Sequence, residues 1–146
     1  MNALLSAPPA NRLSSRETQP EEVVRTQVWH LLSALYPPGQ KAERRGSRRY
    51  PYPYLVYLTP VGADGVTAEG EPIVVVGKHL SERGFGFYHP QPLPFRRMIA
   101  TLEATNGVRL GFLIDLTWCR FTRHGWYESG GRFLQAVPSP LANSAG

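Results

Sequence analysis

The sequence has one cysteine and no long apolar run, and both shortages limit what it can encode. With Cys119 alone, neither an internal disulfide framework nor a cysteine-rich zinc site can form, and this cysteine usage suits a reducing cytoplasm. No segment approaches the roughly 18 consecutive apolar residues of a membrane-spanning helix, and residues 1–10 lack the features of a secretory signal. We therefore expect a cytoplasmic protein without a membrane span.

Recognisable catalytic motifs are also missing. The chain contains no P-loop, no nucleophile elbow and no paired-carboxylate arrangement. The four histidines, His30, His79, His89 and His124, are scattered; His79 and His89 alone can approach each other across a hairpin, and two histidines without a nearby carboxylate or thiolate make a poor zinc site. The sequence therefore predicts a protein that is not an enzyme and needs no metal or cofactor.

Charged residues are few, but their balance is basic. They make up 18% of 146 residues, with a formal net charge of +5 at pH 7. This length fits one domain with a short appendage, since single cores typically form at roughly 100–150 residues. The excess of cations favours an anionic partner, and charge alone does not distinguish a nucleotide from a nucleic acid or an acidic protein surface.

The N-terminal part of the chain predicts a tail, a helix and a linker. Residues 1–17 are rich in Ala, Ser, Pro and Asn without periodicity, which predicts a disordered tail. An amphipathic helix over 18–36 follows, with Thr18 and Glu21 at capping-box spacing and Pro20 in the first turn. Its apolar residues recur at helical spacing: Val24, Val28, Leu31 and Leu35. Residues 37–49 form a basic linker.

The rest of the chain predicts an all-β domain over residues 50–136, followed by a disordered tail over 137–146. Short apolar runs separated by Gly and Pro are typical of a barrel or sandwich. The predicted strands are Tyr52–Thr59, Ile73–Gly77, Phe85–His89, Arg97–Glu103, Leu110–Phe121 and Trp126–Leu134. In the fifth strand apolar residues from Leu110 to Trp118 alternate with others, which predicts one buried face with Asp115 on the opposite, solvent face. Asn106 and Gly107 predict a hairpin turn.

Two segments carry recognisable binding chemistry. Four arginines, Arg44, Arg45, Arg48 and Arg49, stand just before the first predicted strand. Arginine donates bidentate hydrogen bonds to phosphate and guanine and stacks on bases, although a solvated basic linker is the alternative interpretation. The second segment, His79–Gly84, follows an apolar strand and places a hydroxyl and a glycine in a short turn; alone it also fits a plain β-turn.

Taken in order, these segments resemble the PilZ domain family. Arg45-x-x-x-Arg49 is similar to the family's RxxxR signature, and Ser81-x-x-Gly84, followed by Phe85-Gly86-Phe87, is similar to its [D/N]xSxxG signature. Residues 116–120 resemble the family's late strand and residues 127–133 its closing strand. The resemblance covers about residues 44–134, most of the chain that we expect to be ordered.

The resemblance implies a six-stranded antiparallel PilZ-like β-barrel, preceded here by the amphipathic helix, whose arginine segment clamps cyclic di-GMP over the barrel mouth. Arg45 and Arg49 would contact the phosphates and stack on guanine, and Ser81 and Gly84 would line the guanine edge. Arg44 and Arg48 have the same spacing and offer an alternative register. The implied ligand-binding residues are Arg44, Arg45, Arg48, Arg49, His79, Ser81 and Gly84.

His79 departs from the family pattern, which has an acid or amide at this position. An aspartate accepts two hydrogen bonds from guanine, whereas a neutral histidine offers one acceptor nitrogen and a protonated one offers none. The lost bond is worth about 1–3 kcal/mol, which corresponds to a tenfold to hundredfold loss of affinity.

The expected function is that of a bacterial cyclic di-GMP receptor or adaptor in which nucleotide binding orders the linker and repositions the helix. One alternative is a degenerate PilZ domain that captures a protein partner, for example through the helix, without nucleotide. A second alternative is a basic β-barrel that binds single-stranded nucleic acid, with Tyr50, Tyr52, Tyr54 and Tyr57 as stacking surfaces.

Overall fold

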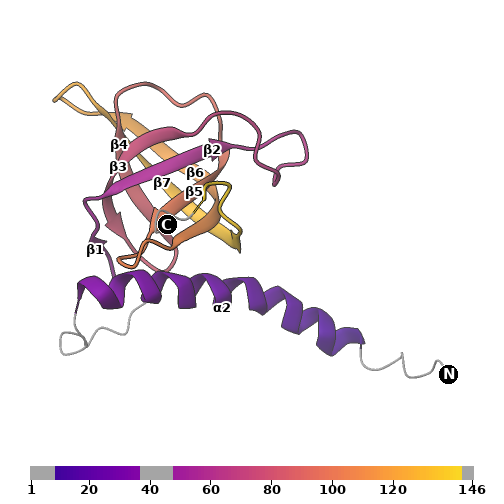
Figure 1. Cartoon of the computed structure of the whole chain (residues 1–146). Helices are drawn as coiled ribbons and strands as arrows, with labels where there is room; N and C mark the ends of the chain where they lie inside the picture. Colours follow the sequence, from indigo (N-terminus) through magenta and orange to yellow (C-terminus); the bar gives the residue numbers. More distant parts are fainter. Residues whose placement is uncertain (1–8, 37–47, 143–146) are drawn as a thin grey trace.

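The computed structural model describes residues 9–36 and 48–142, which form one β-barrel with a helix across its end (Figure 1). The strands are β1 (Tyr50–Pro51), β2 (Leu55–Pro60), β3 (Ile73–Leu80), β4 (Gly84–His89), β5 (Arg97–Glu103), β6 (Arg109–Phe121) and β7 (Tyr127–Val137). The helix, α2, spans Pro9–Leu35. The predicted all-β class, with an N-terminal helix, is confirmed.

The barrel is closed by six antiparallel strands. The hydrogen-bonded order is β3-β2-β5-β6-β7-β4, and β4 returns to pair with β3, so the sheet has no free edge except where the two-residue β1 adds to the end of β3. All pairings are antiparallel. Closure satisfies the backbone groups that an open sheet would leave exposed at its edges.

One hydrophobic core fills the barrel and continues under the helix. Buried side chains from alternate positions of the strands, such as Val56, Phe87 and Phe112, point inward. Val24, Val28, Leu31 and Leu32 of α2 are buried in the same cluster, and Leu35 packs against it. The apolar stripe of the helix is therefore used to cover one end of the barrel (Figure 1).

The helix is longer at its N-terminal end than the sequence predicts. It begins at Pro9 rather than at residue 18, so Pro20 lies inside it, and it ends at Leu35 rather than at residue 36. A proline at this position removes one backbone hydrogen bond, which a helix that continues on both sides can tolerate. The structure thus differs from the predicted tail over residues 9–17, and residues 1–8 lie outside the described residues.

The six predicted strands correspond to β2–β7, with end points shifted by up to a few residues. The turn at Asn106 and Gly107 is present: Gly107 has a φ of 88°, and the Asn106 side chain accepts a hydrogen bond from the Val108 amide. The segment between β2 and β3 is a loop that is closed by one isolated bridge between Val61 and Ala68.

Strand β6 does not keep one buried face along its whole length, as its alternation predicts. Phe112 and Ile114 are buried, but Trp118 is 43% exposed. The register of β6 against β7 shifts between Leu116 and Trp118, and a bulge of this kind re-aims the side chains that follow it. Asp115, predicted to face solvent, is mostly buried and pairs with Arg96 at 3.3 Å.

Candidate functional site

Several of the predicted binding residues line one cavity on the outer wall of the barrel. Arg49, His79, Ser81 and Gly84 surround a cavity of about 230 Å³. They come together because β1 pairs with the end of β3, with Pro51 opposite His79, which places Arg49 beside the turn between β3 and β4. The structure therefore joins the two segments that the sequence singles out. Arg44 and Arg45 lie outside the described residues.

Arg48 is oriented differently from Arg49. Its guanidinium lies over the ring of Tyr50, with its carbon 5.2 Å from the ring centroid. Tyr50 in turn packs against Trp29 and Tyr36 of the helix region. Within the described residues, Arg48 thus belongs to the contact between β1 and the helix, and it is not among the residues that line the cavity.

A row of four residues paired across four strands lies at the cavity, and three of them, His79, Gly130 and Trp118, line it. His79 of β3 pairs with Gly86 of β4, Gly86 pairs with Gly130 of β7, and Gly130 pairs with Trp118 of β6. Phe85 and Phe87 point into the core, so Gly86 between them faces outward. The two central positions of this glycine row (His79, Gly86, Gly130 and Trp118) therefore have no side chain, and the rings at its two ends lie over them.

Both rings lie close to the glycine backbone. A Cβ atom at Gly86 would be 2.7 Å from Cε1 of His79, and one at Gly130 would collide with Nε1 of Trp118. Each strand that carries a ring also has a register shift beside it, between Gly77 and His79 in β3 and between Leu116 and Trp118 in β6. The bulges turn the two rings over the neighbouring glycines, and the glycines leave room for the rings because they have no side chain.

The turn after His79 is held by Ser81. The Ser81 amide donates to the carbonyl oxygen of Gly84 at 2.9 Å, and the Ser81 hydroxyl accepts from the Arg83 amide and donates to the same carbonyl, both at 3.2 Å. Gly84 has no room for a side chain, because a Cβ there would collide with the carbonyl oxygen of Gly131. Ser81 and Gly84 thus shape the cavity as well as line it.

The cavity is cationic, and His79 within it is neutral at pH 7. Burial, followed by the charges of Arg49 and Lys78, lowers the pKa of His79 below its usual 6.5. Its Nδ1 atom is buried and has no hydrogen-bond partner within the described residues. Arg83 and Arg132 also line the cavity, and no carboxylate is among its described lining residues. An unpaired imidazole nitrogen surrounded by arginines suits a polar, anionic ligand.

Sequence reasoning missed seven residues that line the cavity: Arg83, Phe85, Thr117, Trp118, Gly130, Gly131 and Arg132. All of them stand inside segments that resemble strands or turns of the family, but nothing in their local sequence shows which strand lies next to which. The nearest available signal was the pair of glycines, Gly86 and Gly130, flanked by large residues in two separate strands.

The helix contacts the same turn that shapes the cavity. Glu82, between Ser81 and Gly84, accepts a hydrogen bond from the Trp29 indole at 2.5 Å and pairs with Arg25 at 3.3 Å. The hydroxyl of Tyr36 donates to the carbonyl oxygen of Pro51 at 2.7 Å. The helix region is therefore bonded both to the turn that follows β3 and to β1, the two segments that supply the predicted binding residues.

Two further sequence expectations change with the structure. His89 does not approach His79: it is buried inside the barrel, where its ring nitrogens contact the carbonyl oxygen of Gln91 and the hydroxyl of Ser129. Of the four tyrosines proposed as stacking surfaces, Tyr52 is buried in the core and Tyr50 packs against the helix region, whereas Tyr54 is exposed. The tyrosines thus do not form one stacking platform.

Comparisons with known proteins return little. No protein-family model matches the chain, and no curated protein matches it. Among solved structures, K. pneumonia MrkH in its apo state matches with a TM-score of 0.44 and 12% sequence identity, over 65% of this chain and 45% of that one. The chain thus spans less than half of that structure.

In the described residues, α2 is not apolar enough to cross a membrane. Fold and cavity define the class: a closed β-barrel with a cationic cavity on its outer wall.

Proposed function

We propose that this chain is a receptor module, without catalytic activity of its own, that binds cyclic di-GMP at the glycine row. The observation that carries the proposal is the convergence of Arg49 with His79, Ser81 and Gly84 on one cavity, because these residues come from two segments far apart in the sequence. Cyclic di-GMP has two phosphates and two guanines, which matches a cavity that offers guanidinium groups, aromatic rings and an unpaired ring nitrogen.

Each part of the cavity suits one part of the ligand. Arg49, Arg83 and Arg132 are placed to pair with phosphate or guanine, and the exposed indole of Trp118 offers a face for base stacking. Neutral His79, which lines the cavity, can accept one hydrogen bond from a guanine edge through a ring nitrogen. A volume of about 230 Å³ is below the usual range of about 300–1,000 Å³ for ligand pockets, so we expect one base to enter while the rest lies across the surface.

The remaining arginines enter this proposal through the family resemblance. Arg45, four residues before Arg49, would complete the RxxxR pair and close over the dinucleotide, with Arg44 as the alternative register. The ligand would then be held between the arginine segment and the barrel wall. No further cofactor is part of the proposal.

Isothermal titration calorimetry with cyclic di-GMP tests the proposal, with GTP as the ligand control. We expect micromolar or tighter binding by the wild-type protein and no measurable binding by the double variant Arg45→Ala, Arg49→Ala. The matched control is Arg96→Ala, Arg97→Ala, which removes the same charge from a different cavity. Equal loss in both double variants would show that net charge alone attracts the nucleotide, and flat titrations with the wild type would contradict the receptor function.

The helix is the proposed output element. Glu82 lies in the turn that shapes the cavity and also binds Trp29 and Arg25 of α2. A ligand that moves this turn would therefore change the contacts that hold α2 on the barrel. Hydrogen–deuterium exchange over residues 21–35, with and without cyclic di-GMP, measures this coupling. We expect a nucleotide-dependent change that Glu82→Gln reduces. Unchanged exchange in a protein that still binds would contradict the coupling and leave the binding site intact.

A nucleotide-independent adaptor is the second candidate, and His79 in place of an acid is the observation that favours it. It differs from the receptor in one measurable respect, because partner capture would proceed equally with and without cyclic di-GMP. The apolar stripe of α2 is buried on the barrel, so a partner would need another surface of the described protein.

A further inference from the structure

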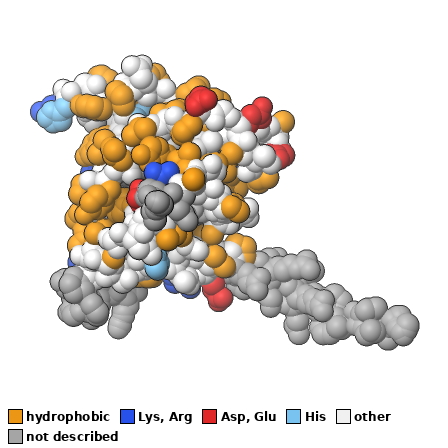
Figure 2. Space-filling model, viewed as in Figure 1, with side chains coloured by type: hydrophobic (Ala, Val, Ile, Leu, Met, Phe, Trp, Pro, Cys, Tyr) orange, Lys and Arg blue, Asp and Glu red, His pale blue; other side chains and the backbone are white. Residues whose placement is uncertain are grey.

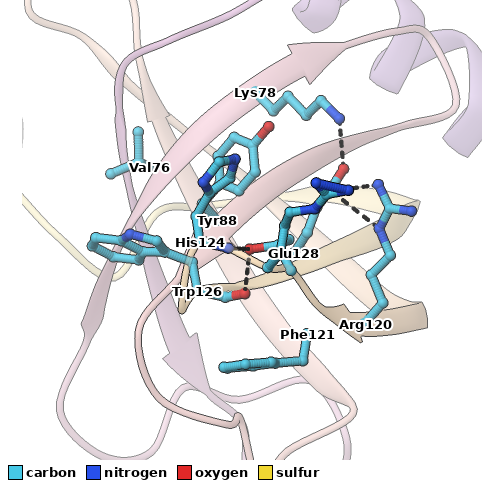
Figure 3. A pocket seen from close by; sticks show the side chains of 10 residues that line it. Val76, Lys78, Tyr88, Arg120, Phe121, His124, Trp126 and Glu128 are labelled. Atoms are coloured by element: carbon cyan, nitrogen blue, oxygen red, sulfur yellow. Dashed lines mark hydrogen bonds and ion pairs between the residues drawn. The ribbon is translucent and has the colours of Figure 1, made fainter.

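A second, larger hollow lies on the same wall of the barrel, beneath the hairpin formed by the end of β6 and the start of β7. It has a volume of about 840 Å³ (Figure 3). Its wall is formed by Val76 and Lys78 of β3, Tyr88 of β4, and residues 120–128 of the hairpin. We call it the hairpin groove. The proposed nucleotide site does not include any of these residues.

Large apolar side chains are exposed in this groove. Phe121 is 62% exposed, Trp126 is 43% exposed and Val76 is 40% exposed. In Figure 3 the ring of Trp126 lies near Val76, whereas the ring of Phe121 lies apart from both and contacts Tyr127. Clustered exposed apolar groups are costly in water, and Trp, Tyr and Arg are the residues that most often anchor protein interfaces.

A buried carboxylate organises the charges of the groove. Glu128 is only 3% exposed, yet Nζ of Lys78 lies 2.6 Å from its Oε2 and the Arg120 guanidinium donates to its Oε1 at 2.9 and 3.2 Å (Figure 3). The bond from Lys78 is the main reason why the pKa of Glu128 lies below its usual 4.5. One acid thus fixes two cations at the edge of an apolar surface.

The charge balance of the groove is positive. Among its described lining residues, Lys78, Arg120 and Arg123 face a single carboxylate, Glu128. Arg123 and His124 are exposed at the hairpin tip, where Figure 2 shows cationic and histidine side chains beside gathered hydrophobic ones. A ligand that neutralises this excess must be acidic.

The hairpin that overhangs the groove is held in one shape. The Thr122 hydroxyl and amide both donate to the carbonyl oxygen of Trp126, at 2.9 and 2.8 Å, and the His124 amide donates to the Thr122 hydroxyl. Gly125 supplies the left-handed backbone, with a φ of 88°. A preformed surface loses little conformational entropy when a partner binds.

We propose that the hairpin groove binds an acidic segment of a partner protein that carries an aromatic or leucine anchor. The anchor would pack against Trp126 and Val76, and acidic residues on either side would pair with Arg120 and Arg123. The exposed apolar surface favours a partner with an apolar anchor, and the excess of cations favours acidic residues in that partner. The groove runs from β3 to the hairpin tip, which suits an extended peptide. This inference does not depend on nucleotide binding.

Fluorescence anisotropy with labelled peptides tests the proposal on the nucleotide-free full chain. The probes are octapeptides with Trp, Phe or Leu at the centre and Asp or Glu at every other position, and the controls replace each acid with Lys. We expect the acidic peptides to bind at micromolar concentration and the basic ones not to bind. Trp126→Ala and Arg123→Glu should each weaken binding at least about tenfold.

The matched control is Phe95→Ala, which removes an aromatic side chain that is 39% exposed, against 43% for Trp126, at a different cavity and should leave binding unchanged. Failure of all acidic peptides to bind, or equal binding to Trp126→Ala, would overturn the proposal. Sedimentation that shows a dimer broken by Trp126→Ala would identify a second copy as the occupant and would overturn it as well. Circular dichroism of each variant confirms that the barrel is folded.

Discussion

Two neighbouring rows of residues on one wall of the barrel show how the same four strands can make opposite surfaces. In the glycine row, the two central positions are Gly86 and Gly130. In the next row toward the hairpin, the central positions of the same strands are Tyr88 and Glu128, flanked by Val76 and Arg120. In the first row the rings of His79 and Trp118 from the outer strands cover the two glycines, whereas the second row is filled by an aromatic ring and an ion-pair network of its own central residues.

The difference teaches that side-chain size at two positions, rather than the backbone path, decides which side chains cover this wall of the barrel. Strand spacing is the same in both rows, since sheet geometry fixes it. The glycine row leaves the cations Arg49, Arg83 and Arg132 around an opening without a carboxylate, whereas Glu128 neutralises part of the charge in the second row. Four variants sharpen this contrast.

The largest expected effect comes from adding a side chain to the glycine row. Gly86→Ala places a methyl group 2.7 Å from Cε1 of His79, so the ring must leave the position from which it lines the cavity. We expect the affinity for cyclic di-GMP, measured by calorimetry, to fall at least about 100-fold, which equals about 2.7 kcal/mol. Tyr88→Phe in the second row is the control and should bind normally. Wild-type affinity in Gly86→Ala would show that binding does not depend on the position of the His79 ring.

His79→Asp should change affinity in the opposite direction. An aspartate accepts two hydrogen bonds from guanine where neutral His79 accepts one, so we expect binding to tighten by about tenfold to hundredfold. His124→Asp makes the same charge change at the exposed hairpin tip and should have no effect. Weaker binding in His79→Asp would mean that the ring contributes by stacking rather than by accepting a hydrogen bond.

In the filled row, Glu128→Gln should affect stability rather than nucleotide binding. The variant leaves Lys78 and Arg120 beside a buried neutral amide, so we expect the free energy of unfolding in urea to fall by about 1–3 kcal/mol. Because the pKa of Glu128 is lowered in the folded state, this stabilisation is present above pH 4.5 and is lost as pH falls through the folded pKa. A wild-type urea midpoint would contradict the structural role of the network.

The smallest expected effect is the pH dependence of nucleotide affinity at the glycine row. The folded state lowers the pKa of His79 below 6.5 and so favours its neutral form. Affinity for cyclic di-GMP should therefore stay constant from pH 8 to 6.5 and decline at lower pH, as protonation removes the acceptor. Stability should also decline below pH 6.5, because the unfolded chain then binds the proton more readily. His79→Gln should remove the pH dependence of affinity, and a profile that is unchanged in this variant would contradict the assignment.

The sequence predicted the fold better than the site. Alternation and turn residues located all six barrel strands, because period-two burial is a local property. Resemblance to a family drew attention to Arg49 and His79–Gly84, which the structure brings together. Trp118, Arg83 and Arg132 were missed because their proximity depends on sheet register and on two bulges, and these are set by long-range pairing. The predicted start of the helix at residue 18 was wrong because Pro20 and the capping-box spacing indicate a first turn there, whereas the helix begins at Pro9.

Barrel closure also determines when the site exists. His79 and Gly86 belong to one hairpin, Gly130 and Trp118 belong to another, and the seam between β4 and β7 joins them. A chain made from its N-terminus completes the first hairpin well before the second is available. We therefore expect an immature or frayed barrel to be unable to bind at this row, and any ligand that bridges the seam to resist its opening. Under the proposed function, only molecules that had finished folding would bind the nucleotide.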